Sequence, residues 1–408
     1  MPVPVRPAPP GRTLAAGILR EDVQGRMDAF SSDLAEVVAQ DSGSGSAEGI
    51  RTLSRFFEDR LRQLGADILR VPVESPHIGD LGDVLVATLR GTGTTHTLLC
   101  AHLDTVFSAG EAAARPLRID DDGIAYGPGA SDDKGGALAG LYALEALGCR
   151  HWDSYGSITF VLVPDEEIGS PGSGPVIGEL AAGKDQALCL ECARPNGDLV
   201  VARKGVADLV FTISGRAAHA GIEPEKGANA AVAAAYLAID LQSLADLWPD
   251  VTLNIGHIRA GTQANVVAAE ATIVADLRAA NPEHFADVVA RAGELALVCR
   301  VPGTTTTLRL GAPAQPWATR PGDRSLAERA QRLGADLDLE LGLAVTGGSA
   351  DANHLSAVVP AVLDGLGPVG GDDHSLTEWL DLKSVPDRVA LLAALLLDEE
   401  ASGDADQA

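Results

Sequence analysis

Histidine and carboxylate side chains that could bind a metal ion follow several of the strands predicted from this 408-residue sequence. His102-Leu-Asp104 ends one apolar run, and Asp165-Glu166-Glu167 ends another. In a strand, residues i and i+2 point to the same side, so His102 and Asp104 can lie together. A metal-bound imidazole usually donates its second N–H to a carboxylate or a carbonyl, which suits His102 as a ligand and Asp104 as the residue that orients it. Taken alone, H-x-D is more simply a surface His–Asp pair.

Glu166 and Glu167 are adjacent acids at the end of a buried strand, where a cation or a raised pKa would relieve their repulsion. Neighbouring side chains there point in different directions, so one can bind a metal while the other takes a proton from the attacking water. An exposed acidic loop explains the pair equally well in isolation. Glu191 ends a third strand and says little alone. His374 lies in Gly-Gly-Asp-Asp-His-Ser, whose glycines suggest a loop close to another group.

The stretch Tyr126–Gly136 (Tyr-Gly-Pro-Gly-Ala-Ser-Asp-Asp-Lys-Gly-Gly) places Asp132 between a tight turn and an apolar helix. Gly127 and Gly129 permit backbone angles that other residues rarely adopt, and Pro128 stiffens the turn. A carboxylate has two oxygens, so Asp132 can bridge two cations. A capped helix start is the alternative, since Ser and Asp are good N-caps. Two histidines and several carboxylates, with no thiolate pair nearby, suit zinc, cobalt or manganese, as one ion or as two about 3.5–4 Å apart.

Composition restricts the class of partner. The net charge is −26, from 31 basic and 57 acidic residues, which argues against nucleic acid or an anionic membrane. The 46% hydrophobic and 22% charged residues are typical of a soluble globular protein. The N-terminus has no apolar signal region, and no run of about 18 apolar residues could span a bilayer. Five cysteines without framework spacing indicate reduced thiols in a cytoplasmic protein.

Apolar strands alternate with amphipathic helices, which predicts an α/β fold with a doubly wound, mostly parallel sheet. Ligands bind beyond the carboxyl ends of the strands in such sheets. Near Lys204 the order becomes strand-helix-strand-strand-helix-strand, the split βαβ (ferredoxin-like) arrangement of an inserted domain. We therefore expect a disordered leader (1–20), a first part of the catalytic domain (21–202), the inserted domain (203–317), a second catalytic part (318–400) and a tail (401–408).

One competing motif is Gly365-Leu-Gly-Pro-Val-Gly370, which spells the G-x-G-x-x-G of dinucleotide-binding proteins. No helix is expected after it, and Pro368 with Gly371-Asp-Asp removes the geometry that cradles phosphate, so we expect no dinucleotide site. The H-E-x-x-H and G-x-S-x-G signatures of other hydrolases are absent.

Several motifs occur in one order over most of the chain: His102-Leu-Asp104, Gly127-Pro-Gly-Ala-Ser-Asp-Asp-Lys-Gly-Gly136, Asp165-Glu-Glu167, Glu191, Arg203-Lys-Gly205, Gly215-Arg-Ala-Ala-His-Ala-Gly221 and His374-Ser…Glu378. Through them the chain resembles the metallopeptidase family of bacterial glutamate carboxypeptidase, acetylornithine deacetylase and succinyl-diaminopimelate desuccinylase. The glutamate carboxypeptidase branch is the most similar, through Gly-Pro-Gly-x-x-Asp-Asp-Lys-Gly-Gly and the spacing of Asp-Glu-Glu.

The resemblance implies two zinc ions per chain, with cobalt or manganese as alternatives. The implied metal ligands are His102, Asp132, Glu167, Glu191 and His374. Asp132 would bridge the two ions. His102 and Glu191 would bind one ion, and Glu167 and His374 the other. The peptide bond after Asp132 would be cis, as in the family.

The resemblance also implies the catalytic residues. Glu166 would be the general base, and Asp104 would orient His102. The inserted domain of this family closes over the site and commonly forms a homodimer. Its His219 would reach the tetrahedral intermediate, often in the site of the partner subunit. A simple turn histidine is the alternative for His219.

Asn265 and Arg278 match family positions that contact the carboxylate end of the substrate, and Gly348 lies in a Gly-rich loop expected near the substrate. A solvated residue at the end of an edge strand is the alternative for Arg278. One departure concerns specificity: the glutamate carboxypeptidase branch has an Arg near the segment where this chain has Ala312, which puts glutamate specificity in doubt.

The resemblance implies a hydrolase of an amide bond next to a free carboxylate, a carboxypeptidase or N-acyl amino acid deacylase acting on small peptides or N-acyl amino acids. The alternative is a deacylase of an acylated amino-acid or diamine intermediate in biosynthesis, and the acidic residues Asp372 and Asp373 are its only support. A non-catalytic member of the fold is disfavoured, because every implied ligand and the base are present.

Overall fold

The computed structural model describes residues 12–398, with side chains from Ala15 onward except that of Ala312. These residues form two compact units. The first unit comprises residues up to Val201, Thr319–Val345 and the chain from His354, and the second comprises Ala202–Ala318 and Thr346–Asn353. The expected insertion, 203–317, falls within the second unit. The loop 347–353, which we expected in the catalytic domain, also groups with the second unit.

A six-stranded sheet forms the centre of the first unit, in the order β1-β2-β6-β3-β7-β14. Its strands are β1 (Asp67–Ser75), β2 (Gly79–Arg90), β6 (Ser157–Val163), β3 (His96–His102), β7 (Gln186–Cys189) and β14 (Val362–Leu363). The strands from β6 to β14 are parallel, and β2 and β1 extend the sheet antiparallel. Every residue of β6 is buried, as in sheets that are covered on both faces. The mostly parallel sheet predicted from the sequence is confirmed.

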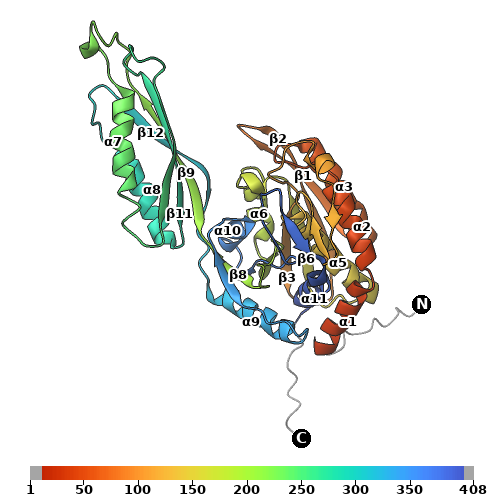
Figure 1. The fold of residues 1–408 in the computed structure, drawn as a ribbon. Helices are drawn as coiled ribbons and strands as arrows, with labels where there is room; N and C mark the ends of the chain where they lie inside the picture. The colour runs from red at the N-terminus through yellow and green to blue at the C-terminus, as the bar shows by residue number, and fades with distance from the viewer. Residues whose placement is uncertain (1–11, 399–408) are drawn as a thin grey trace. The chain divides into compact units, whose positions relative to one another are not determined.

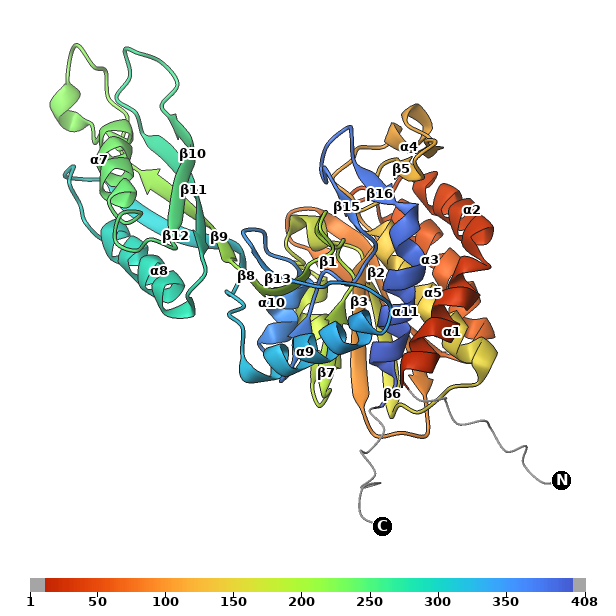
Figure 2. The same cartoon turned by 60° about the horizontal axis from the view of Figure 1, so that its bottom comes forward.

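The helices of the first unit are α1 (Arg12–Gln24), α2 (Met27–Val38), α3 (Ala47–Gln63), α4 (Glu111–Ala114), α5 (Lys134–Arg150), α6 (Ser173–Ala181), α9 (Pro321–Ala335) and α11 (Val385–Leu396), and α10 (Asp351–Ser356) lies at the division between the units. The amphipathic helix α3 packs its apolar face against β1 and β2, whereas α5 is buried on nearly all sides between β3, α2 and α11 (Figure 1 and Figure 2). The loop that precedes α5 is therefore attached to a rigid part of the core.

The N-terminal helix corrects one expectation. We expected residues 1–20 to be a disordered leader, but residues 12–24 form α1. Ala16 and Leu19 are fully buried, and α1 packs against α11. Burial of these apolar side chains offsets the entropy cost of ordering the segment. Residues 1–11 of the expected leader and the expected tail, 401–408, lie outside the described residues.

A second, four-stranded antiparallel sheet in the first unit has the order β15-β16-β5-β4. Its strands are β15 (Gly370–Gly371), β16 (Trp379–Asp381), β5 (Ile124–Tyr126) and β4 (Arg118–Ile119). Trp379 of β16 pairs with Tyr126 of β5. This pairing brings the segment after β5, which contains Asp132, to the segment before β16, which contains His374.

The second unit is a four-stranded antiparallel sheet with two helices, α7 (Ala230–Gln242) and α8 (Pro282–Ala296), on one face (Figure 1). Its strands, in spatial order, are β10 (Thr252–Ala260), β11 (Glu270–Ala279), β9 (Gly205–Ser214) and β12 (Thr305–Ala314). Along β9, buried residues alternate with less buried ones, because successive side chains point to opposite faces. The buried set packs against α7 and α8 and forms a separate core.

The remaining elements are short. Strands β8 (Leu199–Arg203) and β13 (Leu343–Thr346) pair with each other, and the chain passes from the first unit to the second within each of them. Single turns of 3-10 helix are η1 (Glu166–Ile168), η2 (Pro224–Lys226) and η3 (Leu382–Ser384). Across residues 12–398, no helix combines the length and the apolarity that a bilayer crossing requires.

Candidate metal centre

Three neighbouring parallel strands bring candidate ligands to one edge of the large sheet. β3 ends at His102, and β7 is followed by Glu191. Glu166 and Glu167 follow β6 in the turn η1. β3 lies between β6 and β7, and its last residue is paired with the last residue of β6. The carboxyl ends of these strands therefore coincide, and the side chains that follow them meet there.

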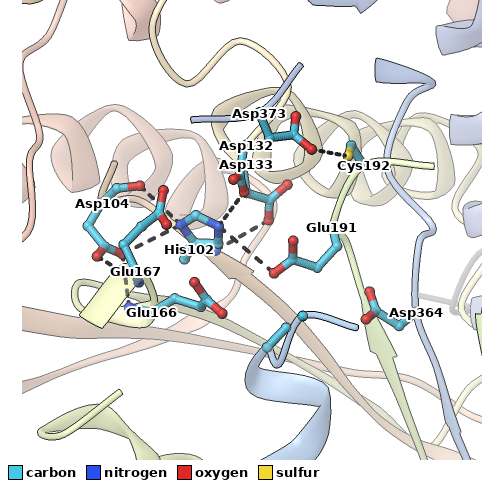
Figure 3. Close-up of polar contacts among 12 residues, drawn as sticks. His102, Asp104, Asp132, Asp133, Glu166, Glu167, Glu191, Cys192, Asp364 and Asp373 are labelled. Carbon is cyan, nitrogen blue, oxygen red and sulfur yellow. Dashed lines mark hydrogen bonds and ion pairs between the residues drawn. The ribbon is translucent and has the colours of Figure 1, made fainter. Parts of the chain in front are cut away.

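Asp132 lies between two histidines that come from different parts of the chain. Its Oδ1 is 2.9 Å from Nε2 of His102, and its Oδ2 is 3.1 Å from Nε2 of His374. The same nitrogen of His374 is 2.9 Å from Oε2 of Glu167. On the other side, Oε1 of Glu191 is 3.9 Å from Nε2 of His102. Figure 3 shows His102 surrounded by these carboxylates. The carboxylate of Asp132 thus lies between two pairs of side chains, His102 with Glu191 and His374 with Glu167.

The donor set fits divalent metal ions. His102, Glu166 and Glu191 each offer a ligand atom within 4.8 Å of the others, and so do His102, Asp132 and Glu167. Imidazole nitrogen and carboxylate oxygen without thiolate are ligands that zinc, cobalt and manganese accept. Because Glu166 belongs to the first group, its carboxylate lies close enough to His102 and Glu191 to reach a water molecule bound there. These distances bring together all five implied ligands and the implied base.

Asp104 holds the turn that carries Glu166 and Glu167. Its Oδ1 accepts a hydrogen bond from the N–H of Glu166 (3.0 Å), and its Oδ2 accepts from the N–H of Glu167 (3.1 Å) and from the hydroxyl of Ser44 (2.6 Å). Nδ1 of His102 is 3.0 Å from the backbone oxygen of Asp104 and 3.5 Å from its Oδ1. Asp104 therefore contacts both the ligand histidine and the segment with the base.

Glu378 is a residue of the site whose contact sequence reasoning missed. It is 1% exposed, and its carboxylate accepts hydrogen bonds from the backbone N–H of Gly129 (3.0 Å), Ser131 (2.9 Å) and Asp132 (3.1 Å). Burial raises its pKa to about 7, against the effect of these three bonds. The available signal was its position four residues after His374 in an implied family motif. Glu378, which lies in the segment of His374, therefore holds the loop that contains Asp132.

The peptide bond between Asp132 and Asp133 is cis, as the resemblance implied. Asp133 precedes α5, but its side chain does not cap that helix. Instead, its Oδ2 accepts a hydrogen bond from the N–H of His102 (3.3 Å). Asp132 and Asp133 therefore both face the end of β3. The alternative that these acids serve as N-caps of the following helix does not explain them.

The G-x-G-x-x-G segment, 365–370, serves the same edge of the sheet. The N–H of Gly367 donates to the backbone oxygen of Glu191 (3.0 Å), and a Cβ at Gly367 would lie 2.3 Å from the oxygen of Leu190. The buried guanidinium of Arg388 donates to the oxygen of Gly367 (3.0 Å) and to that of Gly365. A strand, β15, follows rather than a helix, so the segment holds Glu191 in place and lacks the geometry of a dinucleotide site.

The pKa values of the metal-free site show how strongly it favours positive charge. Hydrogen bonds to Asp132 and Glu167 raise the pKa of His374 to about 10. Burial opposes the charge on His102, but the carboxylates of Asp104 and Asp132 outweigh burial and raise the pKa of His102 well above its ordinary value. Burial opposes the charge on Asp132 as well, and the two histidines nevertheless lower its pKa. A site that stabilises two imidazolium groups is electrostatically suited to cations.

His219 and Asn265, which the resemblance implied as functional residues, are exposed neighbours in the second unit. His219 forms a β-bridge with Val266, and the N–H of Ala220 donates to the backbone oxygen of Asn265 (3.0 Å). These segments lie just beyond Glu270, where β11 begins.

Arg278 lies near the other end of β11. Its Nη1 donates to the oxygen of Gly347 (3.1 Å), and its Nε donates to Oδ1 of Asp276 (2.9 Å). The oxygen of Gly348 accepts from Nη1 of Arg203 (3.4 Å). Two guanidinium groups therefore contact the Gly-rich loop. The roles of Arg278 and Gly348 in binding a substrate stay predictions.

An α/β sheet with histidines and carboxylates gathered at its strand ends is typical of metal-dependent hydrolases. Residues 98–398 match the model of the peptidase family M20/M25/M40, and the chain belongs to this family. The chain is 32% identical to carboxypeptidase G2 of a Pseudomonas species over 369 residues, which are 90% of this chain and 88% of that one. It is 26% identical to a succinyl-diaminopimelate desuccinylase of Nitrosospira multiformis over 343 residues, 80% of this chain and 87% of that one. The protein is therefore a hydrolase.

Solved structures share the fold. The aminopeptidase PepT of Bacillus cereus superimposes with a TM-score of 0.73, at 22% identity, over 91% of this chain and 98% of that one. The M20 family metallo-carboxypeptidase Sso-CP2 of Sulfolobus solfataricus does so with a TM-score of 0.69, at 15% identity, over 90% and 98% of the two chains. At these identities the likeness concerns the fold alone.

Proposed function

We propose that this protein is a dinuclear zinc hydrolase that cleaves an amide bond next to a free carboxylate, as a carboxypeptidase or an N-acyl amino acid deacylase. The observation that carries the proposal is the position of Asp132, whose two oxygens lie 2.9 Å from His102 and 3.1 Å from His374. A carboxylate with one imidazole at each oxygen is suited to bridge two ions, a common arrangement in hydrolytic enzymes. The 32% identity to a carboxypeptidase supports the same conclusion.

Bound zinc would polarise the scissile carbonyl and lower the pKa of a water molecule. Glu166 then takes the proton from the attacking water and passes it to the leaving amine. Asp104 supports this step, because it holds the N–H of Glu166 at 3.0 Å. From the family resemblance, His219 stabilises the oxyanion that develops on the carbonyl. Also from the resemblance, Arg278 and Asn265 contact the free carboxylate of the substrate, and Gly348 lies in a loop near the substrate.

The geometry of the second unit supports a homodimer. His219 and Asn265 lie beyond the first residue of β11, and Arg278 is its penultimate residue. Eight steps along a strand span about 26 Å, more than a small amide substrate covers. One copy of this unit cannot present both Arg278 and the neighbours His219 and Asn265 to the same substrate, so a second chain supplies His219 and Asn265.

An exposed apolar stripe offers a surface for that second chain. Val232, Tyr236 and Ile239 lie at helical spacing on α7 and are 44%, 46% and 70% exposed. Helix α7, which carries them, contacts β10, an edge strand of the sheet. An apolar stripe beside an open strand edge is suited to pairing with an identical copy.

The biosynthetic deacylase of a diamine is the weaker alternative. Its support was the acidic pair Asp372 and Asp373, expected to receive a cationic group. In the structure, Asp372 accepts a hydrogen bond from the hydroxyl of Thr377 (3.1 Å), and Asp373 accepts from the thiol of Cys192 (3.4 Å). Asp372 thus contacts its own loop and Asp373 contacts the segment after β7, and these contacts within the protein favour the carboxypeptidase or N-acyl amino acid deacylase.

Zinc content and amide hydrolysis test the proposal together. Elemental analysis of the wild type should find about two zinc ions per chain, and Asp132→Asn should lose both. Asp323→Asn is the control, because it also removes a carboxylate charge inside the first unit. Asp323 is fully buried, caps α9 and accepts from the N–H of Val362 (2.8 Å). One zinc ion that is unchanged by Asp132→Asn would refute the bridge. A zinc-loaded wild type that cleaves no N-acyl amino acid or dipeptide would refute the activity.

A further inference from the structure

We infer that the first unit contains a preformed subsite for an uncharged acyl group, beside Glu167 and between the segments 41–46 and 105–109. The subsite is a cavity of about 470 Å³. Its size is in the range of pockets that bind small molecules. The inference rests on the proposed function, in which residues of the second unit bind the free carboxylate and the other side of the amide bond needs a place.

The cavity adjoins the metal centre. Glu167 forms part of its wall, and the carboxylate of Glu167 is 2.9 Å from His374. Ser44, also in the wall, donates its hydroxyl hydrogen to Asp104 (2.6 Å). We place the acyl group of the substrate in this space, with the carbonyl carbon at the metal centre on the other side of Glu167.

The two wall segments are fixed to each other before any ligand binds. Gly43 and Thr105 form a parallel β-bridge, and the N–H of Ser44 donates to the oxygen of Thr105 (3.1 Å). The carboxylate of Asp41 accepts from the N–H of Gly110 (2.7 Å) and of Ala112 (2.9 Å). These bonds lower the entropy cost of binding, because the walls need not be ordered by the ligand.

The chemistry of the lining selects against negative charge. Ser46, Val106, Phe107 and Ile168 contribute hydroxyl and apolar surface, and the lining includes no Lys, Arg or His. Apart from Glu167, which would hold zinc, its one ionisable side chain is the acidic Asp41. A neutral peptidyl, acetyl or benzoyl group fits such a lining, whereas the carboxylate of a succinyl group would meet the charge of Asp41 and find no cationic partner in the lining.

Binding to an inactivated protein tests the subsite. The zinc-loaded Glu166→Gln protein keeps every lining residue and can be titrated by calorimetry with N-benzoyl-L-alanine and N-succinyl-L-alanine. We expect the benzoyl compound to bind at least about tenfold more tightly. Adding Val106→Arg places a cation in the lining and should reduce or reverse that preference.

Ile119→Arg is the matched control, since Ile119 is 44% exposed, Val106 is 43% exposed and only Val106 lines the cavity. Equal or tighter binding of the succinyl compound would overturn the inference, and so would a Val106→Arg effect no larger than that of Ile119→Arg. Hydrolysis is measured separately on the wild type. If the enzyme is active but shows no such preference, the subsite is refuted and the proposed function stands.

Discussion

The backbone N–H of Asp132 donates a hydrogen bond to the buried carboxylate of Glu378 at 3.1 Å, across 246 positions of the sequence. Glu378 holds two more N–H groups of the same loop. We expect Glu378→Gln to weaken zinc binding about 10–100-fold, the usual cost of losing a residue that positions a metal ligand. Chelator competition measures this affinity without relying on turnover.

Hydrogen exchange gives a second readout for Glu378. In the zinc-free wild type, the amides of Gly129, Ser131 and Asp132 are hydrogen-bonded to this side chain, so they should exchange slowly, and Glu378→Gln should accelerate all three. Asp323→Asn, which also removes a buried carboxylate that caps backbone N–H groups, should lower stability and leave zinc affinity unchanged. Wild-type zinc affinity in Glu378→Gln would contradict the role.

The affinity for zinc should increase with pH. In the metal-free protein the pKa of His374 is about 10 and that of His102 is also raised, so both imidazoles hold a proton at neutral pH that zinc must displace. Each displaced proton strengthens the apparent affinity about tenfold per pH unit. Competition with a chelator of known pH dependence, between about pH 6 and about pH 8, measures the slope. His284→Asn, which removes the 2.7 Å contact with Asp250 in the second unit, should leave the slope unchanged, and a flat profile would contradict the expectation.

The same histidine makes a prediction for stability. Because the folded pKa of His374 exceeds its unfolded value of 6.5, its contribution to the stability of the metal-free protein is complete below about pH 6.5 and is lost as pH rises towards about 10. Thermal unfolding of zinc-free protein should show a falling midpoint over this range. The fall should be smaller in His374→Ala, and an equal fall in both proteins would assign it to other groups.

Replacing Ile239 with Arg should separate the proposed dimer. Ile239 is 70% exposed on α7, and a charge in a paired apolar stripe costs several kcal/mol when it is buried without a partner. Light scattering should show the mass of a monomer. Amide hydrolysis should fall with it, because His219 would no longer reach the second site. Leu297→Arg, at a residue that is 83% exposed just beyond α8, should change neither property, and a fully active Ile239→Arg monomer would refute catalysis by the partner's histidine.

Helix α1 should contribute to global stability. Leu19 is fully buried in the main core, so Leu19→Ala should lower the free energy of unfolding by about 2–5 kcal/mol. Glu21→Ala, at an exposed position of the same helix, should change it by less than about 0.5 kcal/mol. Urea denaturation of the zinc-loaded proteins measures both. Equal stability of Leu19→Ala and wild type would mean that α1 is dispensable.

Much of the site could be anticipated because its residues follow apolar runs. Such runs predict buried strands, and parallel strands present their carboxyl ends together. This logic predicts that His102, Glu166 and Glu191 lie at one edge of the sheet. The implied bridge at Asp132 and the place of His374 came instead from family resemblance, since no local pattern connects a turn with a distant Gly-rich loop.

Helix α1 shows why local signals can fail. It follows a Pro-rich start and has neither an acidic residue in its first turn nor a basic one in its last, so the favourable charges that mark helix ends are missing. Packing against α11, more than 350 positions away, decides that the segment is ordered. Tertiary burial outweighs a weak local preference.

The sequence by itself determined the apolar strands and amphipathic helices of the main sheet, which of them carry chemically active side chains, and that these side chains are suited to divalent metals. Only the tertiary structure decided that Glu378 holds the loop of Asp132, that Arg388 supports the segment beside Glu191, and that the wall segments around Gly43 and Thr105 line a cavity of about 470 Å³. Helices and strands can be predicted because apolar residues recur with a period of about 3.6 or 2 over short stretches of sequence. These contacts depend instead on backbone C=O groups, which every residue carries, and on N–H groups, which every residue except proline carries. No residue pattern therefore identifies the distant segments that fold together.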